Sequence, residues 1–272
     1  MSVHAAQTTR VSTRTLRQMK EQGEKISMLT AYDYTFASLI DEAGIDMILV
    51  GDSASNVICG NTTTLPITLE EMIFLTKGVR RAAKRAFVLF DMPFGSYQES
   101  EESAMRNAIR VLKETGADGI KMEGGRQIVP LVKKLTAAGV PVMAHLGLTP
   151  QSVNQFGGYG LRAKEEAEAQ QLLEDSLALE EAGCFSLLYE KIPAALGAKV
   201  TRSVKVPTIG IGAGGEMDGQ VLVLQDMLGM TQGFQPKFLR RFADLGNVIK
   251  EATQQYIAAV KDNSFPSKDE QY

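Results

Sequence analysis

The chain has 272 residues, with 44% hydrophobic and 22% charged residues and a formal net charge of −3. This balance is typical of a globular protein with a sizeable core, and it excludes a strongly basic nucleic-acid binder. The two cysteines, Cys59 and Cys184, argue against a disulfide scaffold. Because no run of 18 apolar residues and no secretory signal occur, we expect a cytoplasmic protein without a membrane span.

Residues 13–23 are predicted to form an N-terminal helix, and one unit then repeats along the chain. In this unit an amphipathic helix ends at a glycine, a short apolar strand follows, and polar residues end the strand. Thr68 and Glu71 have the spacing of a capping box ahead of one such helix. Glycine suits the helix ends because it adopts the left-handed conformation without a Cβ clash. These glycines are Gly44, Gly116, Gly139 and Gly183.

Eight short strands are expected, most of them continuous apolar runs, as in parallel sheets buried on both faces. They begin near Ser27, Asp46, Phe87, Gly119, Pro141, Phe185, Pro207 and Val221. Strands alternating with helices predict an α/β fold, here a (β/α)8 TIM barrel; a doubly wound open sheet is the alternative. We expect one domain over 1–272, with 13–23 on the barrel floor and a last helix at 239–261 closing the ring. Residues 1–12 and 263–272 are expected to be loose tails.

Reactive side chains follow the predicted strands, at the rim where the active site of a closed parallel barrel lies. Asp33 precedes a helix and is better explained as its N-cap. Lys121 should point away from Ile120 and Met122, and Glu123 is its natural partner. Other polar residues at strand ends are Asp52, Ser53, Asp91, His145 and Glu190.

Each of these residues also has a structural interpretation. Lys121 and Glu123 can form a purely structural ion pair, and His145 can be a hydrogen-bonded core residue. The glycines at 210, 212, 214 and 215 are only a weak indication of a phosphate-binding loop, because glycine also allows close backbone approach.

Three carboxylates, from Asp52, Asp91 and Glu123, would offer oxygen ligands suited to Mg2+. A 2-oxo acid could chelate this ion through its carboxylate and carbonyl, and the ion would stabilise an enolate. Lys121 would add a cation, and Glu190 would be the general base.

At these positions the sequence resembles the ketopantoate hydroxymethyltransferase family from about residue 13 to 265. The most specific segments are HLGLTPQ and IGIGAG–DGQVLV, in one order. The matching segments are MLTAYDY (28–34), LVGDS (49–53), TLPITLEEM (64–72), FDMPFGSY (90–97), IKMEGG (120–125), AHLGLTPQSVNQFGGY (144–159), YEKIP (189–193), IGIGAGGEMDGQVLVLQDMLGM (209–230) and PKFLRRF (236–242).

The resemblance implies a Mg2+-dependent barrel of the phosphoenolpyruvate mutase/isocitrate lyase type, assembled as a homodecamer. The implied reaction transfers a hydroxymethyl group from 5,10-methylenetetrahydrofolate to 3-methyl-2-oxobutanoate and gives 2-dehydropantoate, in pantothenate biosynthesis. Asp52 and Asp91 then match metal ligands that also contact substrate, and Glu123 lies near the ion. Glu190 matches the proton acceptor. The resemblance also implies substrate contacts for Ser53, Lys121 and His145.

The sequence departs from the family pattern at residues 54–56, at 61–62 and at Lys191, which puts the loop over the pocket in doubt. Three alternatives stay open, and only the last of them rests on the altered loop. One is a Mg2+-dependent C–C lyase or mutase acting on another 2-oxo acid. A second is a Schiff-base aldolase that uses Lys121. The third is a barrel without catalytic activity that serves as a scaffold.

Overall fold

The computed structural model describes residues 10–231, 233 and 235–272 and contains a closed barrel of eight parallel strands in sequential order. The expected strand starts agree with the observed ones within two residues. The doubly wound sheet is excluded, because β8 pairs with β1 and closes the ring. The strands are β1 (Ile26–Thr30), β2 (Met47–Val50), β3 (Phe87–Asp91), β4 (Gly119–Glu123), β5 (Val142–Gly147), β6 (Ser186–Glu190), β7 (Thr208–Ile211) and β8 (Gly219–Leu222).

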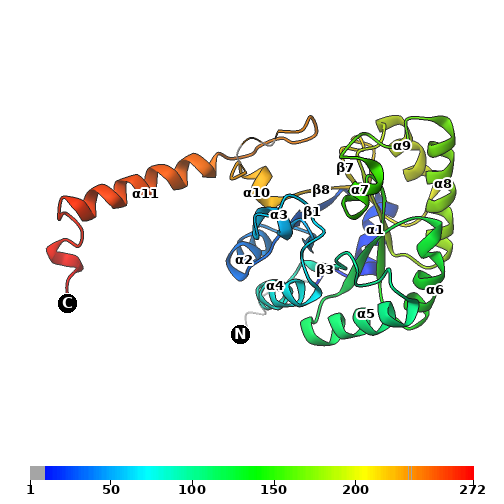
Figure 1. Ribbon diagram of the computed structural model, residues 1–272, viewed down its shortest axis with the longest axis horizontal. Coiled ribbons are helices and arrows are strands. Elements are labelled where there is room, and N and C mark those ends of the chain that lie inside the picture. Colours follow the sequence, from blue (N-terminus) through cyan, green and yellow to red (C-terminus); the bar gives the residue numbers. More distant parts are fainter. Residues whose placement is uncertain (1–9, 232, 234) are drawn as a thin grey trace, which may run out of the picture. The chain divides into compact units, whose positions relative to one another are not determined.

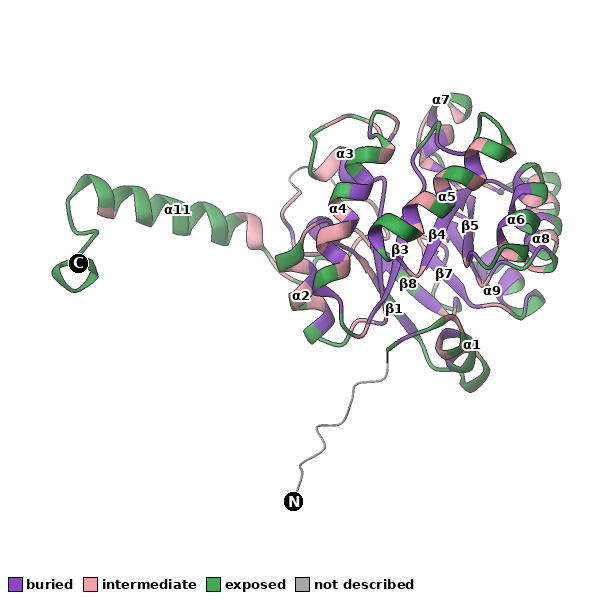
Figure 2. Ribbon diagram, turned by 90° about the horizontal axis from the view of Figure 1, so that it is seen from below, coloured by how far each residue is buried: buried purple, intermediate pink, exposed green. Residues whose placement is uncertain are grey.

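Helices surround the strands (Figures 1 and 2), and the longer helices from α2 to α9 bury apolar residues in the layer between helices and strands. The helices of the barrel are α1 (Thr13–Gln22), α2 (Tyr34–Glu42), α3 (Ala54–Val57), α4 (Leu69–Ala82), α5 (Glu101–Thr115), α6 (Val129–Ala137), α7 (Val153–Phe156), α8 (Glu166–Glu181) and α9 (Ala194–Ser203). Short 3-10 turns, η1 (Arg126–Ile128) and η2 (Pro150–Ser152), precede α6 and α7.

Local signals in the sequence account for several helix boundaries. Thr68 and Glu71 form the predicted capping box at the start of α4. Asp33 caps α2, because its Oδ1 accepts a hydrogen bond from the backbone N–H of Phe36 at 2.9 Å. Gly116 follows α5 at φ 71°, in the left-handed region. The capping interpretation of Asp33 is therefore confirmed.

Alternation along the strands sorts their side chains into two apolar layers. Residues such as Ile120 and Met122 pack outward under the helices. Inward-facing residues such as Leu89 and Met143 fill the barrel together with Leu16 and Met19 of α1. The N-terminal helix is thus the predicted floor, at the opposite end of the strands from α3 and α7 (Figure 2).

The two ends of the chain depart in part from the expected loose tails. Val11 is buried, and its backbone N–H donates to the carbonyl of Arg85, so residues 11 and 12 belong to the folded barrel. Residues 1–9 lie outside the described part of the chain. At the other end, residues 263–272 are exposed and include a short 3-10 turn, η3 (Lys268–Glu270).

The chain divides into two compact units, one ending at Leu222 and the other spanning Val223–Tyr272. The second unit contains α10 (Leu224–Met227) and α11 (Leu245–Lys261). The last helix begins at Leu245 and not at Leu239, because the backbone N–H groups of Phe242 and Leu245 donate to carbonyls of α10 and the residue after it. A single domain over 1–272 remains a prediction. Among the described residues, no helix is both long and apolar enough to cross a membrane.

Candidate active site

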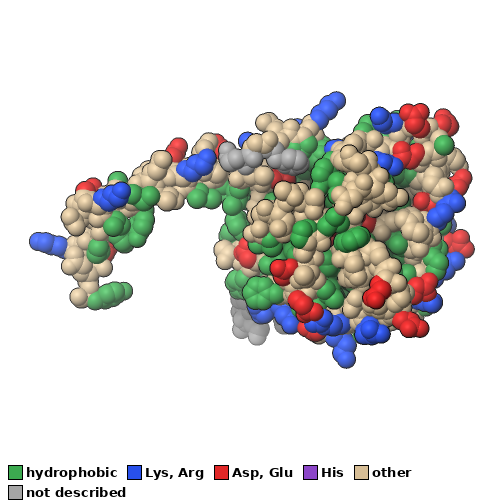
Figure 3. All heavy atoms as spheres, viewed as in Figure 1, with side chains coloured by type: hydrophobic (Ala, Val, Ile, Leu, Met, Phe, Trp, Pro, Cys, Tyr) green, Lys and Arg blue, Asp and Glu red, His purple; other side chains and the backbone are tan. Residues whose placement is uncertain are grey.

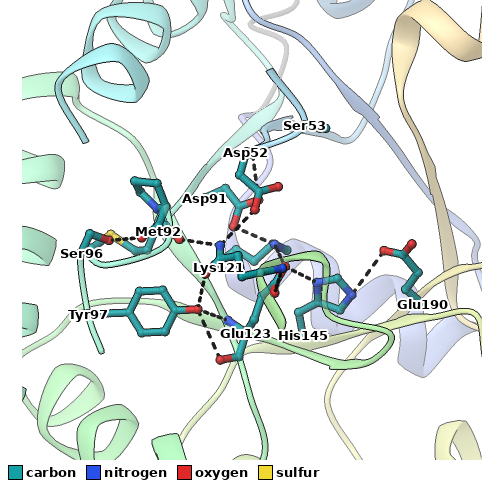
Figure 4. A network of polar contacts seen from close by, with 12 residues as sticks. Asp52, Ser53, Asp91, Met92, Ser96, Tyr97, Lys121, Glu123, His145 and Glu190 are labelled. Carbon is teal, nitrogen blue, oxygen red and sulfur yellow. Dashed lines mark hydrogen bonds and ion pairs between the residues drawn. The ribbon is translucent and has the colours of Figure 1, made fainter. Parts of the chain in front are cut away.

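Polar side chains from neighbouring strands meet inside the barrel at the carboxyl ends of the strands (Figure 4). Asp91, Lys121 and Glu123 occupy alternate positions on β3 and β4, and so they point inward like Leu89. The strand register places Asp91 beside Lys121 and Glu123 beside His145. Glu190, at the end of β6, completes the group. Five of the seven predicted site residues therefore come directly from the inward-facing rows of the strands.

The other two residues, Asp52 and Ser53, lie in the turn after β2. The backbone N–H of Asp52 donates to Asp91 Oδ2 at 3.1 Å, which places the two aspartates side by side at the same rim. Ser53 Oγ shares a hydrogen bond of 2.8 Å with the hydroxyl of Tyr32. A Cβ on Gly51 would lie 2.8 Å from Ser53 Oγ, so glycine lets this turn fold closely on itself. All seven predicted residues are thus brought to one end of the barrel.

Lys121 has two carboxylate partners at the centre of the site. Its ammonium lies 2.7 Å from Asp91 Oδ1 and 3.5 Å from Glu123 Oε1, and its side chain is 3% exposed. The predicted partnership with Glu123 is present, although Asp91 is the closer partner. Burial alone would lower the pKa of Lys121, but the surrounding carboxylates outweigh this effect and raise it. The lysine is therefore a fixed cation.

The net pKa shift differs among the acids of the cluster, although burial raises the pKa of each. It raises the pKa of Asp52, and the neighbouring charge of Asp91 adds to this effect. The pKa of Asp91 is also raised by burial, against the opposing influence of Lys121. Burial would raise the pKa of Glu123 too, but Lys121 and His145 outweigh it and hold that pKa below its ordinary value. When all three acids are ionised, the carboxylates outnumber the single ammonium, and this excess of negative charge contributes to the raised pKa of Asp52.

His145 lies between two acids. Its Nδ1 is 3.4 Å from Glu123 Oε1, and its Nε2 is 3.6 Å from Glu190 Oε2. Both ring nitrogens and Glu123 Oε1 are buried without a hydrogen bond of ordinary length. Burial and the charge of Lys121 lower the pKa of His145, so the imidazole is neutral near pH 7. Unsatisfied buried polar atoms in a cluster of this kind are typical of a site that is completed by a ligand.

Glu190 is the acid with the most suitable environment for a base. Burial raises its pKa to about 8, with a contribution from Glu123 and opposing contributions from Lys121 and Lys191. Its side chain is 16% exposed, which is more than the side chains of Asp91, Lys121, Glu123 and His145. A carboxylate with a raised pKa at an accessible rim can take a proton from a carbon acid.

The charge excess is suited to a divalent cation, but the acids do not form a preorganised set of three ligands. Within the described part of the chain, no group of three or more Asp, Glu, His or Cys side chains is arranged to hold a metal ion. The ammonium of Lys121 contacts two of the three predicted ligands instead. Asp52 and Asp91 remain as two adjacent carboxylates. Mg2+ is commonly bound by one or two carboxylates and keeps water or substrate in its other coordination positions.

Close packing explains part of the glycine run at 209–215. Gly214 has φ 95°, and a Cβ there would lie 2.7 Å from the Cβ of Ala194 on α9. A Cβ on Gly197 would in turn lie 2.1 Å from the carbonyl oxygen of Ala213. Close approach of the loop to α9 therefore accounts for Gly214, whereas a Cβ on Gly210 would lie 2.8 Å from Met217 Cγ and one on Gly215 would meet nothing within 4 Å.

Two residues of the site were not singled out from the sequence, Tyr97 and Gln151. Both are buried and form hydrogen bonds to the acid cluster. They also line a cleft of about 660 Å³ beside it, together with Phe94 and Glu123. Each lies inside a segment that matches the family, FDMPFGSY and HLGLTPQ, but neither ends a predicted strand.

Comparison with known proteins identifies the family of the chain. The family model described as "Ketopantoate hydroxymethyltransferase" matches residues 10–268. The chain is 60% identical over 265 residues to the 3-methyl-2-oxobutanoate hydroxymethyltransferase of Phocaeicola vulgatus, covering 97% of each chain. It is 59% identical over 273 residues to that of Porphyromonas gingivalis, covering 100% of each.

Solved structures share the fold at low sequence identity. Phosphonopyruvate hydrolase in complex with oxalate and Mg++ superposes with a TM-score of 0.61 at 13% identity, covering 96% of this chain and 93% of the other. A 2,3-dimethylmalate lyase described as a member of the PEP mutase/isocitrate lyase superfamily gives 0.57 at 15% identity, covering 96% and 91%. These likenesses confirm the predicted fold type. From its full-length match and its similarity to relatives near 60% identity, the chain belongs to the ketopantoate hydroxymethyltransferase family.

Proposed function

We propose that the protein transfers a hydroxymethyl group from 5,10-methylenetetrahydrofolate to 3-methyl-2-oxobutanoate, giving 2-dehydropantoate for pantothenate biosynthesis. Its family membership supports this reaction. The observation that carries the chemistry is the position of Glu190, a carboxylate of raised pKa beside a buried cluster of opposite charges. The cluster can hold the oxo acid, and the carboxylate can remove its C3 proton.

Mg2+ is the proposed cofactor, with Asp52 and Asp91 as ligands and Glu123 bound through water. The excess of buried carboxylate over ammonium charge supports a cation here. When bound, Mg2+ would polarise the substrate carbonyl and stabilise the enolate. Asp52, Asp91 and Ser53 are proposed to contact the substrate carboxylate and carbonyl through the ion or directly.

Lys121 and His145 are proposed to assist the reaction, Lys121 by contacting the substrate and His145 by positioning the base. The Lys121 ammonium offers a permanent positive charge to the oxygen atoms of the oxo acid. His145, neutral and 3.6 Å from Glu190, can hydrogen-bond to the base and hold its carboxylate toward the substrate. Glu190 takes the C3 proton, and C3 forms a bond to the methylene carbon of the folate. Water supplies the hydroxyl oxygen, and both bonds from the methylene carbon to nitrogen break, so that tetrahydrofolate leaves.

Deuterium exchange at C3 of 3-methyl-2-oxobutanoate, with and without Mg2+, tests this proposal. The wild-type protein should catalyse metal-dependent exchange without folate. Glu190→Gln should lower the exchange rate by about 10²–10⁴-fold, the usual contribution of a positioned base. Oxo-acid binding by the variant, followed by calorimetry, should change little. Exchange at the wild-type rate in the variant would refute the role of Glu190.

The same assay separates the alternatives. A barrel that acts only as a scaffold would show no exchange, and a lyase or mutase would not form 2-dehydropantoate when folate is supplied. A Schiff-base aldolase would be trapped covalently by borohydride. We expect no trapping, because Lys121 is held protonated by its two carboxylate partners and a protonated amine is not a nucleophile.

We also propose a homo-oligomer, a decamer by resemblance to the family, and a cytoplasmic location. None of the residues of α11 is buried. Apolar side chains are visible along the surface of this helix (Figure 3), which supports an assembly. The exposed ones include Val248, Ile249, Tyr256, Ile257 and Val260. Both cysteines are free thiols, in keeping with a reducing compartment.

A further inference from the structure

One glutamine connects two of the acids at the rim. The backbone N–H of Gln151, in η2 after β5, donates to Glu123 Oε2 at 2.9 Å. Its side-chain amide donates to Asp52 Oδ2 at 3.0 Å and also to the carbonyl of Met92 at 3.0 Å. Gln151 is 5% exposed. A single residue therefore bonds to carboxylates that come from the turn after β2 and from the end of β4.

Tyr97 and Gln98 together determine which way the amide of Gln151 faces, and Gln98 Nε2 donates to Gln151 Oε1 at 3.2 Å. The hydroxyl of Tyr97 accepts a hydrogen bond from the backbone N–H of Glu123 at 3.0 Å. The hydroxyl has one proton, and the nearest acceptor for it is Gln151 Oε1 at 2.8 Å. With its oxygen held there, the amide must direct both N–H groups to Asp52 and Met92. The chain of donors thus runs in one direction, from the β4 backbone through Tyr97 and Gln151 to Asp52.

We propose that Gln151, oriented by Tyr97, is a positioning residue for the divalent cation, an inference that rests on the proposed metal-dependent function. A neutral donor satisfies one oxygen of Asp52 without neutralising its charge, and it leaves the other oxygen for a cation. The same residue restrains Glu123, so the separation of the two carboxylates is set before the ion arrives. Hydrogen-bond partners of metal ligands commonly affect metal affinity by 10–100-fold.

Calorimetric titration of Mg2+ into the full-length protein tests this role. Gln151→Met keeps the length of the side chain and the backbone N–H but removes the amide, so the Kd for Mg2+ should rise by about 10–100-fold. Tyr97→Phe removes only the hydroxyl and should raise the Kd by a smaller factor. Because Tyr97 acts through Gln151, the double variant should bind Mg2+ no more weakly than Gln151→Met alone.

A matched control comes from Gln171 on α8, whose side-chain amide donates to Asp175 away from the cluster. Gln171→Met removes a comparable bond and should leave the Kd for Mg2+ unchanged. Unfolding midpoints measured in a chelator identify any variant that fails to fold, and Tyr97→Phe, which keeps its ring, then remains as the test. Excess Mg2+ should restore C3 exchange in Gln151→Met but not in Glu190→Gln.

The outcomes separate this inference from the proposed function. A folded Gln151→Met protein with the Mg2+ affinity of the wild type would overturn the positioning role alone. Additive losses in the double variant would overturn the directional connection through Tyr97. Absence of Mg2+ binding by the wild-type protein would overturn both the proposed metal centre and this inference.

Discussion

Glu190 and its neighbours determine how the proposed reaction should depend on pH. The base acts as a carboxylate, so the exchange rate should rise with pH through its pKa, which burial raises to about 8. Binding of Mg2+ near Glu123 would reduce the negative charge that Glu190 faces and so lower this pKa. We therefore expect the rate of C3 exchange to rise to a plateau with an apparent pKa between the ordinary value of a glutamate and about 8. A rate that falls over this range would contradict the assignment.

Lys191, a departure from the family pattern, provides a second test of the same carboxylate. It follows Glu190 with φ 46°, in the left-handed region, and its ammonium hydrogen-bonds to the carbonyl of Tyr159. Its positive charge lowers the pKa of Glu190. Lys191→Met should therefore raise the apparent pKa of the exchange reaction and slow exchange at pH 7. Lys191→Arg, which keeps the charge, should leave the pH profile in place.

Asp91 forms an ion pair with Lys121 and is also a proposed ligand of Mg2+. Asp91→Asn leaves the Lys121 ammonium without its nearest carboxylate at a position that is 3% exposed. Breaking a buried ion pair on one side costs about 3–5 kcal/mol, so the free energy of unfolding should fall by this order in denaturant titrations. Mg2+ affinity should fall as well. Glu216→Gln removes an exposed partner of Arg202 and should cost less than about 1 kcal/mol.

At the scale of elements, α1 contributes to stability at the end of the barrel away from the site. Leu16 is fully buried among the inward-facing strand residues. Leu16→Ala should lower the free energy of unfolding by about 2–5 kcal/mol, because the cavity cannot be filled by the surrounding strands. Exchange activity below the new unfolding temperature should be retained. Leu39→Ala, at a position that is 58% exposed, is the control and should have little effect on stability.

The strands and the inward-facing residues could be predicted because they depend on local patterns. Runs of mostly apolar residues predicted the eight strands. The alternation of β4 placed the side chain of Lys121 on the opposite face of the strand from Ile120 and Met122. The start of α11 could not be predicted in this way. Leu239 and Phe242 have helical spacing, but backbone hydrogen bonds from Phe242 and Leu245 to the region of α10 keep the segment before Leu245 out of the helix.

The contacts of Tyr97 and Gln151 could not be predicted either. The two residues are 54 positions apart, and they meet only because the loops after β3 and β5 lie on the same rim. No periodicity relates such positions. The set of metal ligands could not be predicted for the same reason. The sequence indicated three carboxylates, but it did not indicate that Lys121 lies between two of them, Asp91 and Glu123.

For the molecule as a whole, the exposed apolar residues of the second unit lead us to predict that the protein forms an oligomer. Apolar residues of α11, among them Tyr256 and Ile257, are exposed by 58% and 44%. Large exposed apolar faces are characteristic of interaction sites. The double variant Tyr256→Glu and Ile257→Glu should therefore reduce the molar mass measured by light scattering after gel filtration. Lys250→Glu, a change of charge on the same helix, is the control. A wild-type protein that is monomeric at micromolar concentration would contradict the proposed assembly.

Closure of the barrel has a consequence for synthesis on the ribosome. The ring is complete only when Gly219–Leu222 pairs with the strand that begins at Ile26. A nascent chain that ends before this point has two open sheet edges, at β1 and β7, and each is a template for pairing with other chains. The first and last strands to emerge must therefore find each other before the nascent protein is protected from aggregation.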